Sequence, residues 1–131
     1  MKRSYTALGE TEMELLQHVW AIGEATVADV HQRVMQYRPV AYTTVMSIMK
    51  KLADKGFLNF RQVGTAYVYT PAQPAEEIQG RVLHDVVNKV FSGSPVALVQ
   101  TLVSQNEMSE AERSEILQLI EQLKAIPPDA S

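Results

Sequence analysis

The sequence predicts a mainly α-helical protein of the α+β class, with a winged helix-turn-helix domain at residues 1–71 and an all-helical domain at residues 72–131. Three observations support this prediction. Residues 10–56 contain three segments in which apolar side chains recur with the period of a helix. Two runs of aromatic and β-branched residues then flank Gly64, as in a β-hairpin. After Pro74 the pattern is helical only, and the charge becomes acidic.

Composition indicates a globular protein without covalent cross-links. Hydrophobic residues make up 46% of the 131 residues, which is enough for a core. The absence of cysteine excludes disulfides and thiolate metal sites. No apolar run approaches the ~20 residues of a membrane span, and the opening MKRSYTALGE lacks the apolar segment of a signal peptide. We therefore expect a cytoplasmic protein that does not insert into a membrane.

Charge is distributed unevenly along the chain, although the formal net charge is only −3. Residues 1–71 carry eight Lys and Arg against six Asp and Glu, whereas residues 72–131 carry four against nine. Between Arg33 and Arg61, six cations are opposed only by Asp54. A positive field focused in this way is typical of a surface that binds nucleic acid. The two halves of the chain are therefore expected to have different roles.

The first two predicted helices, residues 10–21 and 27–37, form a scaffold. Four apolar residues of the first helix share an inward stripe that includes the only tryptophan, expected to anchor the core: Met13, Leu16, Val19 and Trp20. Thr26 and Asp29 have the spacing of a capping box at the start of the second helix. That helix should end before Pro39, because the residue preceding a proline disfavours the helical conformation.

The third predicted helix, from about Ala41 to a stop at Gly56, has the profile of a helix that reads DNA. Its inward face carries apolar residues at helical spacing: Val45, Ile48, Met49 and Leu52. Its opposite face is small, polar and mostly basic: Thr43, Thr44, Ser47, Lys50, Lys51 and Asp54. A major groove accepts such a face, with short donors for base edges and longer cations for phosphates. An ordinary amphipathic helix with a solvated face is the alternative.

A two-stranded hairpin follows, at residues 57–63 and 66–71. Because an isolated hairpin is marginally stable in water, it must pack on the preceding helices. Three helices followed directly by a hairpin make a winged helix-turn-helix. The hairpin tip, Gln62 to Ala66, is then the wing.

The C-terminal half contains three further predicted helices, at residues 75–91 and 96–104 and after a capping-box start at Ser109. About a dozen large apolar residues in roughly fifty positions are too few to close a separate core. Packing against the same segment of a second chain would bury them, which predicts a homodimer; packing back onto the winged helix is the alternative. The residues expected at the dimer interface are Val82, Val86, Val90, Leu98, Leu102, Ile116, Leu119, Ile120 and Leu123.

The sequence shows no catalytic motif: no Gly-rich phosphate loop, no nucleophile elbow, no H-E-x-x-H and no paired carboxylates with a nearby base. His18, His31 and His84 lie on three different predicted helices without the spacing of metal ligands. We therefore expect neither an enzyme nor a bound cofactor or metal ion.

Several motifs together carry a resemblance to a known family: LGE-x-E at 8–12, Trp20, TV-x-DVH at 26–31, AYTTVM at 41–46, L-x-x-KGFL at 52–58 and Y-x-Y-x-P at 67–71. With them the sequence resembles the penicillinase-repressor (BlaI/MecI-type) transcriptional regulators over nearly its whole length. The AYTTV stretch with its flanking pattern is quite specific to this group, whereas many winged helices share the fold without it.

The resemblance implies a dimeric repressor on a palindromic operator, with each recognition helix in a major groove and each wing on the flanking backbone. Thr43, Thr44, Met46 and Ser47 would then face bases or adjacent phosphates. Backbone phosphates would be bound by Arg38, Lys50, Lys51 and Arg61. The full set expected at the DNA is Arg38, Ala41, Tyr42, Thr43, Thr44, Met46, Ser47, Lys50, Lys51, Arg61 and Thr65.

The resemblance also implies a route of induction. Members of the family are typically released from DNA when a membrane-bound sensor protease triggers cleavage in the dimerisation segment, usually at an Asn-Phe bond. The matching position here is Thr101-Leu102, which departs from that pattern. Control of β-lactam resistance or of related genes is implied, and the lack of cysteine excludes the copper-responsive branch. Two alternatives remain: a winged-helix protein-interaction module, and a repressor released by a small ligand bound among the apolar C-terminal helices.

Overall fold

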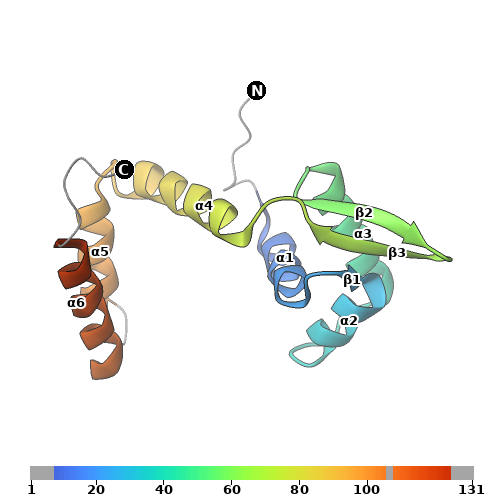
Figure 1. The fold of residues 1–131 in the computed structure, drawn as a ribbon, viewed down its shortest axis with the longest axis horizontal. Helices are drawn as coiled ribbons and strands as arrows, with labels where there is room; N and C mark the ends of the chain where they lie inside the picture. Colours follow the sequence, from blue (N-terminus) through green and yellow to red (C-terminus); the bar gives the residue numbers. More distant parts are fainter. Residues whose placement is uncertain (1–7, 106–107, 125–131) are drawn as a thin grey trace. The chain divides into compact units, whose positions relative to one another are not determined.

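The computed structural model describes residues 8–105 and 108–124. In chain order its elements are α1 (Glu10–Ile22), β1 (Ala25–Thr26), α2 (Val27–Met35), α3 (Tyr42–Asp54), β2 (Leu58–Val63), β3 (Ala66–Pro71), α4 (Ala75–Val90), α5 (Pro95–Gln105) and α6 (Glu110–Lys124). Three helices, a hairpin and three further helices confirm the predicted fold class (Figure 1). The chain divides into two compact units, the first ending at Val86 and the second beginning at Val87.

The sheet of the first unit has three antiparallel strands in the order β1-β3-β2. The predicted hairpin is present, with Phe60 opposite Tyr69 in its register. On its other side β3 pairs with β1, through Ala25 opposite Tyr69 and Thr26 opposite Val68. We did not predict β1, because a strand of two residues is too short to show the alternation that identifies strands.

The core of the first unit lies between the sheet and helices α1, α2 and α3. Its buried members are Leu15, Leu16, Val19, Ala25, Val27, Val30, Val34, Val45, Met49, Leu52, Phe57, Leu58, Tyr69 and Ile78. The predicted role of Trp20 as a core anchor is wrong in part, since its half-buried side chain packs against this cluster from outside. Leu15 lies in the interior, whereas Met13 is half-buried. Met13 and Trp20 lie about 100° around the helix from the centre of the buried arc.

Helix α2 begins with the predicted capping box but ends earlier than predicted. The Thr26 hydroxyl accepts a hydrogen bond from the amide of Asp29 at 3.1 Å, and the Asp29 carboxylate accepts one from the amide of Thr26 at 3.0 Å. The helix ends at Met35, two residues before the predicted Tyr37. The amides of Tyr37 and Arg38 both donate to the carbonyl of Val34, at 2.9 and 3.0 Å. The chain thus turns tightly before the proline, which suits the restricted conformation of Arg38.

The first part of α4 belongs to the winged-helix unit. The Ile78 side chain is only 1% exposed in its core, and Val82 packs partly against the same cluster. The segment leading to α4 is also held, because the amide of Ala72 donates to the Phe57 carbonyl at 3.0 Å and the Gln73 side chain donates to the Gly56 carbonyl at 3.1 Å. The compact unit therefore extends past the boundary at residues 71 and 72 that we expected from composition.

The second unit contains helices without a buried interior. In the described part of α5 and α6 no residue is buried. The predicted capping box at Ser109 is present, with Ser109 and Glu112 each accepting the other's amide at 3.1 Å. No single described helix is long and apolar enough to cross a membrane; only α4 and α5 taken together as a bent pair meet that test, by length and composition alone.

Candidate nucleic-acid interface

Helix α3 has the two faces that its sequence predicts. Val45, Met49 and Leu52 are fully buried, and the half-buried Ile48 packs against the core. The opposite face is uncovered, and all of these residues on it are exposed: Tyr42, Thr43, Thr44, Met46, Ser47, Lys50 and Lys51. Because the buried face fixes the helix on the core, the exposed residues form one rigidly carried surface, which we call the α3 face.

The first turn of α3 is uncapped. Ala41 precedes the helix in an extended conformation, and no side chain accepts a hydrogen bond from the free amides there. No acidic residue lies in this first turn either. Free amides and the positive end of the helix dipole together attract anions such as a phosphate. This end of the helix is therefore suited to approach a DNA backbone.

His31 holds the start of α3 in place. Its Nε2–H donates to the carbonyl of Val40 at 2.9 Å. The Tyr42 ring lies against it edge-on, with 5.6 Å between the ring centroids. The histidine thus orients the first aromatic residue of the α3 face. We assigned His31 no site role from the sequence, because a side chain bound to a carbonyl nine residues away leaves no recognisable motif.

Arg38, expected to bind a phosphate, has an internal partner in this structure. Its guanidinium donates twice to the Glu14 carboxylate of α1, from Nη2 at 2.6 Å and from Nε at 3.1 Å. A bidentate pair of this kind fixes the plane of the guanidinium. Arg38 still has the Nη1 group to offer to a phosphate, so Glu14 positions it without using all its donors.

The hydrogen-bonded Arg38 lowers the pKa of the Glu14 carboxyl below its ordinary value of 4.5. Because the folded-state pKa is lowered, the pair stabilises the fold above about pH 4.5, and this contribution is lost as pH falls through the folded-state pKa. We expect Glu14→Gln to flatten the acid limb of the stability curve between about pH 6 and pH 3. Urea unfolding at several pH values in this range measures the free energy of unfolding. Glu24→Gln is the matched control, and an equal flattening there would contradict a specific role of Glu14.

Two other cations of the winged-helix unit are also paired. Arg61 on β2 lies 3.1 Å from the carboxylate of Glu24, and the ammonium of Lys55 lies 2.8 Å from that of Glu12. All three acidic partners thus come from α1 or the turn that follows it. The exposed Arg61–Glu24 pair is easily exchanged for a phosphate, since surface ion pairs contribute little.

Lys50 and Lys51 differ from these cations. Among residues 8–105 and 108–124, neither forms an ion pair within 4.0 Å. Both are exposed on the α3 face, about two turns beyond its start. They are therefore the charges that the fold leaves available to a polyanion.

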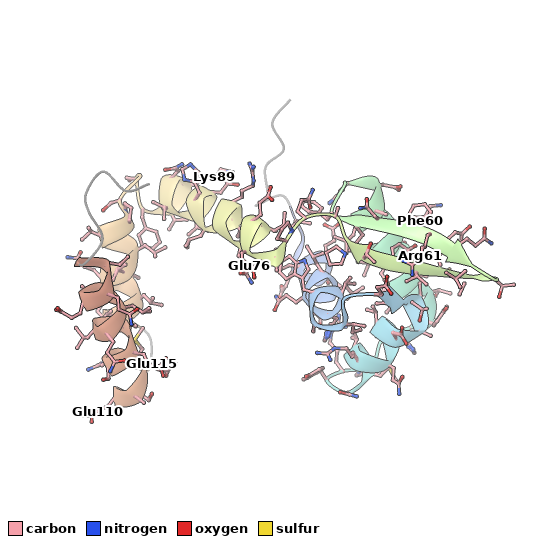
Figure 2. The ribbon with its side chains drawn as sticks, in the orientation of Figure 1. Phe60, Arg61, Glu76, Lys89, Glu110 and Glu115 are labelled. Carbon is pink, nitrogen blue, oxygen red and sulfur yellow. The ribbon has the colours of Figure 1, made fainter. Side chains whose placement is uncertain are left out.

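The hairpin of β2 and β3 carries aromatic surface and little charge. Figure 2 shows Phe60 and Arg61 on β2, where successive side chains point to opposite faces of the hairpin. The Phe60 ring meets Tyr67 edge-on at 5.5 Å, and both rings are exposed. Thr65, expected to contact DNA, is exposed in the turn between β2 and β3. Arg61 is the only Lys or Arg between residues 57 and 71.

Arg33 has an internal partner on α1. Its Nε donates to Nδ1 of His18 at 3.1 Å, which ties α2 to α1. Burial and the charge of Arg33 lower the pKa of His18, so the imidazole stays neutral and can accept this bond. In the described part of the chain, no three His, Asp or Glu side chains are placed to hold a metal ion.

The residues expected at a dimer interface lie in different surroundings. Val82 makes partial contact with the core of the first unit, and Val86, Leu98 and Ile116 are half-buried. The remaining members are exposed: Val90, Leu102, Leu119, Ile120 and Leu123. Thr101 and Leu102, the position that matches the family's cleavage bond, are both exposed on α5.

The interface residues expected from the sequence leave out a second apolar stripe on α5. Val96, Val99 and Val103 are exposed at helical spacing and line an open, almost wholly apolar groove of about 610 Å³. Leu98 and Leu102 lie on another side of the same helix. A helix that is apolar on most of its surface is normally buried against a partner. The signal was present in the sequence, as the i, i+3, i+7 spacing of these valines.

A winged helix-turn-helix with a basic, uncovered third helix defines a class, the DNA-binding transcription regulators. Comparison with known proteins gives the family. The family model described as penicillinase repressor matches residues 8–122 of this chain. The chain therefore belongs to the penicillinase repressor family: it is a winged-helix DNA-binding transcriptional repressor of the BlaI/MecI type and not an enzyme.

Individual relatives agree with this assignment. The transcriptional regulator BlaI of Mycobacterium tuberculosis is 30% identical over 109 residues, which cover 82% of this chain and 79% of the relative. The penicillinase repressor of Bacillus licheniformis is 21% identical over 117 residues, covering 89% and 91%. The solution structure of the DNA-binding domain of the repressor BlaI has the same fold, with a TM-score of 0.51 and 22% identity over 59% of this chain and 93% of that one. Membership in a family of DNA-binding repressors removes the alternative of an interaction module that has lost DNA binding.

Proposed function

We propose that two copies of this chain bind a palindromic operator and thereby repress genes of β-lactam resistance or related genes. The observation that supports this most is the α3 face, which is uncovered and carries the unpaired Lys50 and Lys51. In this proposal α3 enters the major groove and the wing lies on the flanking backbone. Since a repressor acts on the chromosome, we place the protein in the cytoplasm.

The apolar surface of the second unit supports the dimer. Helices α5 and α6 expose seven large apolar side chains besides Leu102: Val96, Val99, Val103, Leu117, Leu119, Ile120 and Leu123. So many exposed large apolar side chains on two short helices are typical of a protein interface. Most homodimers are two-fold symmetric, so two identical DNA-binding units would read two inverted half-sites.

Binding to the duplex upstream of the protein's own gene tests the proposal. Fluorescence anisotropy at about physiological salt would compare this duplex with a scrambled one of equal length. We expect the specific duplex to bind roughly a thousandfold more tightly, with two protomers per site. Equal, weak binding to the two duplexes would contradict repression at that site.

Lys50→Ala is expected to weaken binding to all duplexes. The change removes one contact to a phosphate, so the slope of log K against log salt should fall by roughly one unit. Titrations of the same duplex at several salt concentrations measure this slope. Lys89→Ala on α4, which removes the same charge outside the α3 face, is the control. An unchanged slope in Lys50→Ala would show that this lysine does not touch phosphate.

Release by proteolysis at Thr101-Leu102 is the proposed route of induction, with a membrane sensor protease or its downstream protease as partner. This bond lies inside α5, so local unwinding of the helix must precede cleavage. Release by a small ligand is the alternative, and the apolar groove on α5 offers it no polar anchor beyond Gln100 and Ser104. A C-terminal fragment of matching mass in induced cells would support proteolysis, whereas an intact chain whose melting temperature rises with a ligand would support the alternative.

A further inference from the structure

The α3 face lacks the side chains that usually identify bases. Its first two turns expose Tyr42, Thr43, Thr44, Met46 and Ser47, and none of these is Arg, Lys, Asn or Gln. Arg and Lys make the bidentate hydrogen bonds by which helices identify guanine in the major groove, and Asn and Gln make those that identify adenine. Single hydroxyl groups such as those of Thr and Ser bond to any base. Whatever base preference α3 has must therefore come from other contacts.

The charged residues in and beside α3 do not supply this base preference either. Lys50 and Lys51 follow only after the second turn and are suited to phosphates, which carry no sequence information. Arg38, just ahead of the helix, is held by Glu14 through two hydrogen bonds. The central part of the α3 face is therefore uncharged.

The same surface is unusually apolar for a side exposed to water. Tyr42 and Met46 are 46% and 45% exposed, and they are neighbours at i, i+4 spacing. Thr43 adds a methyl group on the same side of the helix, and Thr44 adds another about 160° around the helix from Tyr42 and Met46. The Tyr42 ring is held against His31, whereas the unbranched Met46 side chain can adapt to the surface it meets.

Only one base offers an apolar group to such a surface. In the major groove the C5-methyl of thymine is the apolar feature, and the other groups on the base edges are hydrogen-bond donors and acceptors. We propose that α3 identifies thymines in each half-site through contacts of Met46, Thr43 and Thr44 with their C5-methyl groups, with Tyr42 closing one side of the contact. This inference rests on the proposed role of α3 as the recognition helix.

The test begins with the full-length protein and a pool of random-sequence duplexes. The tightest duplex recovered is expected to contain thymines at fixed positions in both half-sites. Each of these thymines is then replaced by deoxyuridine, which removes the methyl and leaves base pairing and all hydrogen-bonding groups unchanged. Each replacement at a contacted position should weaken binding roughly threefold to fourfold, as expected for one buried methyl group.

Variants of the protein assign the contacts. Thr44→Ser removes a methyl and keeps the hydroxyl, and Met46→Ala removes the flexible apolar side chain; both positions are exposed, so the fold should persist. For each variant, one uracil duplex should bind as tightly as the thymine duplex. The side chain that contacted this thymine methyl is absent from the variant, so removing the methyl costs no further affinity. Thr11→Ser on α1 is the matched control and should leave every uracil penalty unchanged.

The outcomes separate this inference from the proposed function. Full binding to uracil duplexes, together with weaker binding by Lys50→Ala, would overturn the thymine contacts and leave α3 as the DNA-binding helix. In that case specificity would come from DNA shape. If neither change has an effect, α3 is not at the DNA and both proposals fail. Recovery of no preferred sequence from the pool would also overturn the thymine contacts.

Discussion

Glutamate in place of both Ile120 and Leu123 is expected to separate the proposed dimer into monomers and to weaken operator binding by about a hundredfold or more. Both side chains lie on one stripe of α6 and are exposed within the chain, Leu123 to 63%. Four carboxylates would then be buried in the two-fold interface, at a high desolvation cost. The loss in affinity follows from bivalency, which typically strengthens binding by about 10² to 10⁴. Sedimentation equilibrium measures the mass, and anisotropy measures the binding.

Gln118→Glu is the control for this pair. It adds one negative charge to α6, where the double variant adds two, about 200° around the helix from Ile120, and Gln118 is itself exposed. We expect it to remain dimeric and to bind the operator nearly as the unchanged protein does. A double variant that still sediments as a dimer would place the interface away from this stripe of α6.

Ile78→Ala is expected to destabilise the winged-helix unit by about 2–5 kcal/mol, the usual cost of truncating a fully buried isoleucine. Ile78 belongs to α4, beyond the hairpin, yet its side chain is buried in the core of the first unit. Urea unfolding followed by fluorescence measures the loss. The signal comes from Trp20, the only tryptophan, which packs against the same core and so reports on this unit.

Gln79→Ala is the control for Ile78, one residue further along the same helix and exposed. Away from core or capping contacts, surface substitutions usually stay within about 0.5 kcal/mol, so this variant should unfold at nearly the original urea concentration. Equal stability of Ile78→Ala would show that α4 is not part of the folded winged-helix unit in solution.

Much of the candidate interface could be predicted from the sequence. The buried and exposed faces of α3 follow from residue spacing, because a helix turns by about 100° per residue whatever it packs against. The capping boxes at Thr26 and Ser109 are equally local, since each joins residues three positions apart. The specific AYTTVM motif then indicated the family, which the match over residues 8–122 confirms.

Other features required the tertiary structure. Residue spacing does not show that Glu14 holds Arg38 across 24 positions, or that β1 pairs with β3. It also did not show that Ile78 of α4 lies in the core of the winged helix.

The sequence by itself therefore determined the order of the helices and of the hairpin, the α3 face and the family. The tertiary structure decided which of the cations expected at the DNA form ion pairs. Arg38 and Arg61 are paired with acids of α1 and its following turn, whereas Lys50 and Lys51 form no ion pair with described residues. The physical reason is that periodicity fixes the direction of a side chain relative to its own helix, whereas an ion pair depends on which other element packs beside it.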